Sequence, residues 1–360
     1  MTYDAGGYGL AGTPPPGYAP SGYWPYPPPG YGAPPPTIKP GIVALRPLTL
    51  ADMFNGAVAY IRVNPKATLG LTTIVVVAAQ LLTLVLSLFP FAFTGQLAQT
   101  IDSDEPTAEM MLSWAASGVA STATSFLTAI LLSGLLTVVI GRAVFGAGIT
   151  MSEAWRRFRP RMWALIGFTV LETIGAILLI AVVVLAIVAI TVASNGLIAF
   201  LVGAPLVFAL IAGLVYLGTM LTFAPAAIVL ERRDIVSSIR RSFTLIKGDF
   251  WRVLGIRLLA MLAANLVAGA VAIPFSLSGQ IMLSASSSTG AAMLGLIVLS
   301  VGGAIGQIIT GPFSAGVVVL QYTDRRIRSE AFDLVLRTGA VTGPAAPSDS
   351  TDDLWLTHAS

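Results

Sequence analysis

The chain has 360 residues, of which 55% are hydrophobic and only 10% are charged. A soluble domain usually carries about 25% charged residues, so this composition excludes a water-soluble enzyme. The chain has no cysteine and 1 histidine, His358, which leaves no thiolate chemistry, no Cys-type zinc site and no ordered histidine for a catalytic triad. We therefore predict an all-α polytopic membrane protein that is not an enzyme and has no catalytic residue, cofactor or metal site.

Residues 1–42 are a tail rich in Pro, Gly and Tyr. The unit Pro-Pro-Pro-Gly-Tyr occurs at residues 14–18 and again at residues 27–31. Such a segment buries too little apolar surface to offset chain entropy, so disordered or polyproline II conformers are expected. The two PPxY matches within these units would suit a domain that binds polyproline II ligands. The pattern is consistent with a flexible spacer and also with a contact arm for a protein partner.

Six apolar stretches follow, and each must be a helix if it spans, because the bilayer core has no water to satisfy backbone groups. A span needs roughly 20 apolar residues. No charged residue occurs between Glu172 and Glu231, and residues 194–196 are the turn that divides this run into two spans. We expect the six spans near Ala67–Phe89, Val119–Ile140, Trp163–Val192, Gly196–Phe223, Leu258–Leu277 and Ala291–Gln321, the last interrupted at Gly311-Pro312.

These spans define a transmembrane domain over residues 43–337, and the polar tail at 338–360 is expected to be disordered. Six spans place both termini on one side of the membrane, and all 20 Lys and Arg residues fall on that side. By the positive-inside rule, both termini are predicted to be cytoplasmic. The basic clusters are expected to fix the topology and to contact anionic headgroups, with no nucleic acid as partner. The candidate contacts are Arg156, Arg157, Arg159, Arg161, Arg240, Arg241, Arg325, Arg326 and Arg328.

A short amphipathic stretch followed by a helix breaker precedes each pair of spans. These stretches predict three cytoplasmic interfacial helices and a threefold repeat over about residues 48–145, 148–230 and 235–322. Thr49 and Thr150 are candidate N-caps of the first two helices. The third stretch lacks a Ser/Thr cap. Its apolar stripe is Ile235, Ile239, Phe243 and Ile246.

Glu172 is the one charged residue that falls within an expected span. If the span starts at Trp163, Glu172 lies near the bilayer midplane, where a carboxylate indicates a proton or cation path. If the span starts later, Glu172 lies at the cytoplasmic interface, paired with Arg161 or Arg257. The sequence is consistent with both positions of Glu172.

Three further polar residues, Gln80, Asn265 and Gln307, fall within expected spans. Hydrogen bonds between helices and a substrate path are both consistent with such residues. The spacing of Gly302 and Gly306 favours close helix packing. Together with Glu172, the three amides form the candidate intramembrane polar site.

Several segments resemble the membrane domain named for glycerophosphoryl diester phosphodiesterase. Arg46–Leu50 and Asn64–Gly70 resemble the beginning of that domain. Ser238–Phe243 with Lys247–Val253 is similar to its third juxtamembrane segment, and Tyr322–Leu334 is similar to its closing motif. The resemblance covers residues 43–337.

The resemblance implies a multi-pass protein of the bacterial cytoplasmic membrane, because a tail rich in Pro and Gly is familiar in bacterial members. Ala331 stands where the closing motif usually has Gly. The family name comes from members fused to a phosphodiesterase domain that resembles a TIM barrel and uses histidines. This chain has no room for that domain, so the resemblance implies no such activity.

Two functions fit these observations. The first is a scaffold or partner protein of the cell envelope that uses the N-terminal tail as a contact arm. The alternative is a carrier for a lipid-like or small solute that uses Glu172 and the three intramembrane amides.

Overall fold

The computed structural model describes residues 41–44, 46–94, 108–194, 196–285, 289–341 and 350–356. These residues belong to one compact unit, Ile38–Ser360. Their regular structure is entirely helical, and six of the helices they form are long and apolar enough to cross a membrane. The repeated Pro/Gly/Tyr units, the expected outer loop around residues 95–107 and His358 lie outside the described residues.

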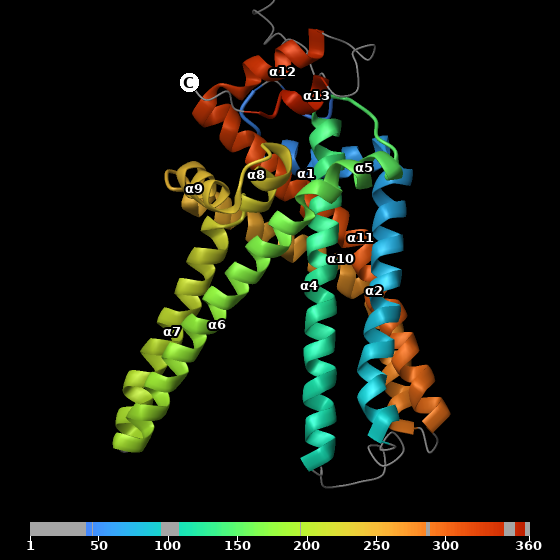
Figure 1. Ribbon diagram of the computed structural model, residues 1–360, viewed down its shortest axis with the longest axis vertical. Helices are drawn as coiled ribbons and strands as arrows, with labels where there is room; N and C mark the ends of the chain where they lie inside the picture. Colours follow the sequence, from blue (N-terminus) through green and yellow to red (C-terminus); the bar gives the residue numbers. More distant parts are fainter. Residues whose placement is uncertain are drawn as a thin grey trace, which may run out of the picture. The chain divides into compact units, whose positions relative to one another are not determined.

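Six long helices form the body of the unit (Figure 1). Their bounds are α2 Pro65–Thr94, α4 Ala108–Val144, α6 Met162–Ala193, α7 Gly196–Met220, α10 Phe250–Ala285 and α11 Thr289–Glu330. Five of the six expected spans lie within one of these helices, and the fourth was expected to end at Phe223, whereas α7 ends at Met220. Most of the helices extend beyond the apolar run, because a helix satisfies its own backbone groups whether or not its ends are in the membrane.

The sixth expected span differs from the structure at its centre. The sequence predicts an interruption at Gly311-Pro312, whereas α11 continues through both residues. Proline removes one backbone donor, but neighbouring helices can satisfy the freed groups of a membrane helix. The Tyr60 hydroxyl donates to the Pro312 carbonyl at 2.5 Å and so connects α1 to this turn of α11.

Short helices gather at one end of the long ones, at the top of Figure 1. They are α1 Leu50–Val63, α5 Met151–Phe158, η1 Arg159–Arg161, α8 Ala224–Leu230, α9 Ile235–Ile246, α12 Phe332–Val341 and α13 Ser350–Asp353. Side chains cap the N-termini of α1, α5 and α9: Thr49 accepts from the Asp52 amide, Thr150 from the Glu153 amide and Asp234 from the Ser237 amide. The Asp234 cap replaces the Ser/Thr cap that the third stretch lacks.

Burial is uneven along the long helices. Leu135, Leu136 and Ile140 of α4 are fully enclosed near the short helices. In contrast, Val192 at the far end of α6 is 83% exposed and Phe208 of α7 is 72% exposed. Large apolar side chains that remain exposed on long helices are expected to face lipid in a membrane protein.

A buried carboxylate, Glu231, joins α8 to α9 and α11. Its side chain is fully buried, and it accepts hydrogen bonds from Arg233 at 2.7 Å and from Arg241 at 3.1 Å. The Tyr322 hydroxyl also donates to it, and Arg326 lies 3.6 Å away. Burial works against the charged form of Arg241, but its hydrogen bond to Glu330 and the charge of Glu231 raise its pKa above the ordinary value.

The expected C-terminal tail is packed in part against this same end. Trp355 follows α13 and is only 2% exposed. Its indole Nε1 donates to the Gly141 carbonyl of α4 at 3.2 Å, and its ring lies 5.1 Å from that of Phe332. Residues 350–356 therefore differ from the expected disorder, because one large aromatic side chain supplies enough buried area to anchor a short segment.

Candidate functional site

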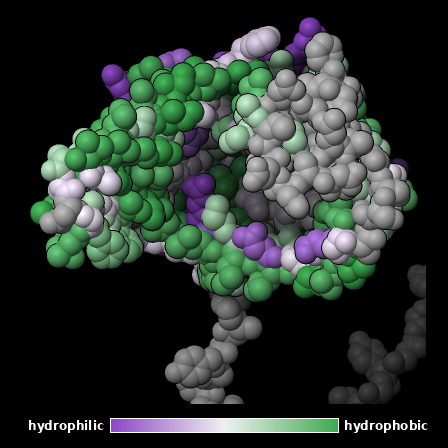
Figure 2. All heavy atoms as spheres, turned by 90° about the horizontal axis from the view of Figure 1, so that it is seen from below, coloured by the Kyte–Doolittle hydropathy of each residue, from purple (hydrophilic) through white to green (hydrophobic). Residues whose placement is uncertain are grey.

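A cavity of about 470 Å³ lies among α4, α6, α8, α10 and α11. Most of its wall is apolar, with Leu132 and Leu136 from α4, Phe168 from α6 and Met261 from α10. Seen from below, the surface is hollowed beside a hydrophobic wall, and hydrophilic atoms are visible in the hollow (Figure 2). We call this space the interhelical cavity.

Two opposite charges line the interhelical cavity, Glu172 of α6 and Arg257 of α10. Both side chains are half-buried, and each acts electrostatically on the other. The described residues contain no direct ion pair between these two groups. Glu172 also lines a neighbouring cavity of about 220 Å³ between α6, α7 and α9. The carboxylate therefore lies where two cavities approach each other.

Arg257 is held in place by the C-terminal end of α7. Its Nη1 donates to the Gly218 carbonyl at 2.7 Å and also to the hydroxyl of Thr222. The last carbonyls of a helix lack partners within the helix, and the helix dipole makes this end negative. A guanidinium at that end is therefore stabilised, and its remaining N–H groups can serve other acceptors.

Gln321 adds an unused acceptor to the same wall. Its side chain is buried, and its Nε2 donates to the Val253 carbonyl at 3.1 Å. Its Oε1 is buried without a hydrogen-bond partner in the part of the chain that the structure describes. A buried acceptor that lacks a partner costs about 1–3 kcal/mol.

The interhelical cavity thus offers a cation and an anion that do not pair directly, together with apolar walls. These groups suit a molecule that has one polar end and one apolar part.

The structure does not gather the four residues of the predicted intramembrane site. Glu172 lines the interhelical cavity, but Gln80, Asn265 and Gln307 are not among its lining residues. Gln80 and Gln307 are half-buried, and Asn265 is exposed on α10. Of the two arginines considered as partners of Glu172, Arg257 faces the same cavity. Whether Glu172 lies at the bilayer midplane or at the interface stays a prediction.

The nine arginines expected at lipid headgroups have different surroundings. Arg156, Arg159 and Arg240 are exposed. The others, apart from Arg161, are engaged with carboxylates of the protein. These ion pairs are Arg157 with Glu153 and Asp352, Arg241 with Glu231 and Glu330, Arg325 with Asp249, Arg326 with Glu231 and Glu330, and Arg328 with Asp324. Headgroup contact stays a prediction for all nine.

The sequence pattern marks Gln321 only as the end of the sixth span and Arg257 only as one partner for Glu172. Both residues lie where apolar runs meet the basic segments. A hydropathy profile assigns such residues to the interface, so it does not show that they turn toward a cavity. The sequence did contain one signal for this. Arg257 lies within the helix that begins at Phe250, and a charged residue inside such a helix indicates a polar surrounding.

Six helices of this length and composition indicate a multi-pass membrane protein. Residues 45–325 match the family described as a domain of unknown function, DUF7847, and the chain belongs to that family. This match does not tie the chain to the glycerophosphoryl diester phosphodiesterase membrane domain. No curated protein and no solved structure matches the chain.

Proposed function

We propose that this membrane protein binds and carries a lipid-like amphiphile, with the polar group of the amphiphile held between Glu172 and Arg257. The observation that carries the proposal is that these two charges face one apolar-walled cavity without forming a direct ion pair. Charged groups within spanning helices are costly and mark ion or substrate paths. A ligand with a polar group would offset this cost by bonding to both.

The shape of the interhelical cavity supports an amphiphile more than a small hydrophilic solute. Small-molecule sites are mostly apolar, with a few polar groups that fix orientation, and a volume near 470 Å³ is within their usual range. Gln321 is a third polar residue on the wall of this cavity, besides Glu172 and Arg257. The apolar part of the ligand would lie along Leu132, Phe168 and Met261.

The proposal includes an orientation and a location. We infer that both termini are cytoplasmic and that the protein lies in the cytoplasmic membrane of a bacterium. All 20 Lys and Arg residues fall on one expected side, which supports the orientation. The order of one capped short helix before each pair of long helices supports a threefold repeat, with α1, α5 and α9 at the cytoplasmic interface. The scaffold function stays a prediction that rests on the N-terminal tail.

Lipid retention provides the test. The full chain is reconstituted in nanodiscs that contain phosphatidylethanolamine and phosphatidylglycerol, and retained lipid is counted by native mass spectrometry after transfer to detergent. Transfer of fluorescent analogues of both lipids is measured in proteoliposomes. We expect Glu172→Gln and the cavity-filling change Ala315→Phe each to lower retention and transfer by about tenfold, which corresponds to about 1.4 kcal/mol.

The matched control is Asn265→Gln, which alters an exposed polar residue of α10 outside the cavity. It should retain and transfer lipid like the unaltered chain. Thermal unfolding in detergent verifies that each variant is folded. Unchanged retention and transfer in folded Glu172→Gln and Ala315→Phe proteins would contradict the carrier proposal and favour the scaffold.

A further inference from the structure

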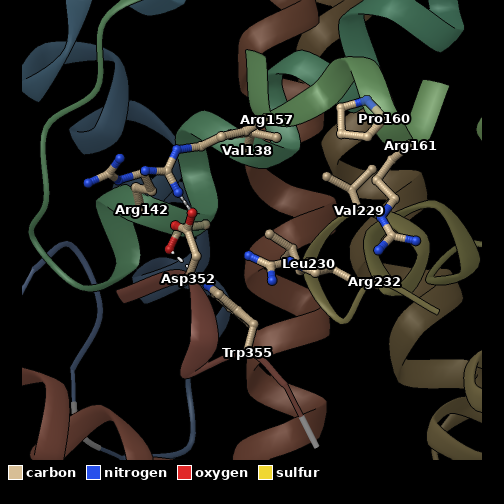
Figure 3. Close-up of a pocket in the computed structure, with 11 residues that line it drawn as sticks. Val138, Arg142, Arg157, Pro160, Arg161, Val229, Leu230, Arg232, Asp352 and Trp355 are labelled. Carbon is tan, nitrogen blue, oxygen red and sulfur yellow. Dashed lines mark hydrogen bonds and ion pairs between the residues drawn. The ribbon is translucent and has the colours of Figure 1, made fainter. Parts of the chain in front are cut away.

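A second cavity, of about 310 Å³, lies among the short helices and is strongly basic. Four arginines from four different elements line it: Arg142 of α4, Arg157 of α5, Arg161 of η1 and Arg232 after α8. The C-terminal segment closes it with Asp352 and Trp355 (Figure 3). We call this space the arginine cavity. It shares no lining residue with the interhelical cavity.

Protein carboxylates satisfy only part of this positive charge. Glu153 lies 2.5 Å from Arg142 Nη1 and 2.8 Å from Arg157 Nη2. Arg161 has no carboxylate partner within the described residues. Arg142 is 5% exposed, and its Nε is buried without a hydrogen-bond partner in the described part of the chain. A buried N–H that lacks an acceptor costs free energy, so the protein does not fully compensate this arginine.

The acidic C-terminal segment partly fills this role. Asp352 forms an ion pair with Arg157, and Asp353 lies 3.5 Å from Arg232. In the view of Figure 3, the Asp352 side chain points toward Arg157, while Arg161 and Arg232 lie on the other side of the cavity. Trp355 anchors the segment through its bond to Gly141 and through the Arg326 side chain, which lies over its ring at 5.7 Å. One carboxylate thus occupies a cavity that four arginines line.

We propose that the arginine cavity is a binding site for a phosphate-bearing anion and that residues 350–356 are an internal competitor that occupies it. Guanidinium groups bind carboxylates and phosphates in the same planar, bidentate manner. The Asp352 carboxylate therefore binds these arginines as a phosphate would, but more weakly. A phosphate group has more acceptor oxygens and more charge than one carboxylate. It can therefore contact arginines on both sides of the cavity, including Arg161. Binding of the anion displaces the segment.

The anion can come from a lipid headgroup or from a soluble phosphate, and the experiment distinguishes these sources. The first arm titrates the full chain in detergent with glycerol 3-phosphate by calorimetry. The second arm compares nanodiscs of phosphatidylcholine with nanodiscs that contain phosphatidylglycerol. The C-terminal segment is followed by a spin label on Thr351→Cys, which is the only cysteine in this variant because the natural chain has none.

We expect Asp352→Asn to tighten anion binding by about tenfold, because it removes the competing charge and keeps the Trp355 anchor. Adding Arg161→Gln to this variant should reverse the gain. The label on residue 351 should become more mobile when the anion binds. Binding of glycerol 3-phosphate with a gain in label mobility would identify a soluble ligand. A gain in label mobility only with phosphatidylglycerol would identify a lipid.

Asp333→Asn is the matched control, because it removes a carboxylate that lies outside the arginine cavity, and it should leave both arms unchanged. Thermal unfolding verifies that every variant is folded. The proposal is overturned if folded Asp352→Asn protein binds neither ligand more tightly, or if Arg161→Gln leaves the gain intact. Both results are independent of lipid retention in the interhelical cavity.

Discussion

The Asp324 carboxylate accepts a hydrogen bond from the backbone amide of Leu48 at 2.7 Å, although the two residues are 276 positions apart. Asp324 also accepts from Arg252 at 3.1 Å and from Arg328 at 3.0 Å. Arg252 in turn donates to the Leu48 carbonyl at 2.8 Å. One carboxylate thereby joins the segment before α1 to α10 and α11. Leu48 and Asp324 lie close to the two ends of the family match, which covers residues 45–325.

We predict that Asp324→Asn destabilises the protein by about 3 kcal/mol, because removing one member of a buried charge cluster leaves the others uncompensated. The measurement is thermal unfolding in detergent, read as a lower Tm. Asp353→Asn is the control, because that side chain is 63% exposed and should have little effect. Equal Tm values for the two variants would disprove the anchoring role of Asp324.

A larger loss is expected for Glu231→Gln, because this fully buried carboxylate lies among Arg233, Arg241 and Arg326. Removing its charge should cost about 3–5 kcal/mol. Glu330→Gln is the matched comparison, since its side chain is 26% exposed and water can compensate part of the loss. The Tm of Glu231→Gln should be well below the Tm of Glu330→Gln. The opposite order of Tm values would contradict this account.

Two adjacent glycines of α11 should respond in opposite ways to alanine. A Cβ on Gly302 would lie 2.5 Å from the Cβ of Phe275 in α10, so Gly302→Ala should cost about 1–3 kcal/mol. A Cβ on Gly303 would meet nothing within 4 Å, so Gly303→Ala should be neutral or stabilising by up to about 1 kcal/mol. Comparing the Tm of the two variants tests whether Gly302 permits close packing of α10 against α11.

Ala331 separates α11 from α12 with a φ of 51°, a conformation that favours glycine. We predict that Ala331→Gly stabilises the protein by about 0.5–1 kcal/mol, since the gain in the left-handed conformation exceeds the entropic cost. The control is Ala264→Gly within α10, which should destabilise by about 1 kcal/mol. A fall in Tm for Ala331→Gly would show that the Ala331 methyl group makes a contact of greater value.

The capping residues were predicted correctly from the sequence, but the apolar pattern did not predict every buried helix face. Thr49 and Thr150 cap α1 and α5 as predicted, because a cap depends only on residues within one turn. In α9 the predicted apolar stripe is only partly buried along much of its length, and the fully buried positions include Ser238 and Ser242. Ser242 donates to the Met220 carbonyl at 2.5 Å and accepts from the Phe223 amide at 3.1 Å. A small polar residue faces inward there because it bonds to the backbone at the end of α7.

The sequence by itself determined that the chain is helical, that six helices can span a membrane, and in which order they occur. Those properties follow from the length of each apolar run, since a helix satisfies its backbone groups without help from other segments. Only the tertiary structure decided which of the sparse charges meet. Glu172 and Arg257 line one cavity without an ion pair, and Asp352 pairs with Arg157, because the rotation and packing of separate helices place them there. The long helices α6, α7 and α10 are apolar on all sides, so hydropathy does not fix their rotation.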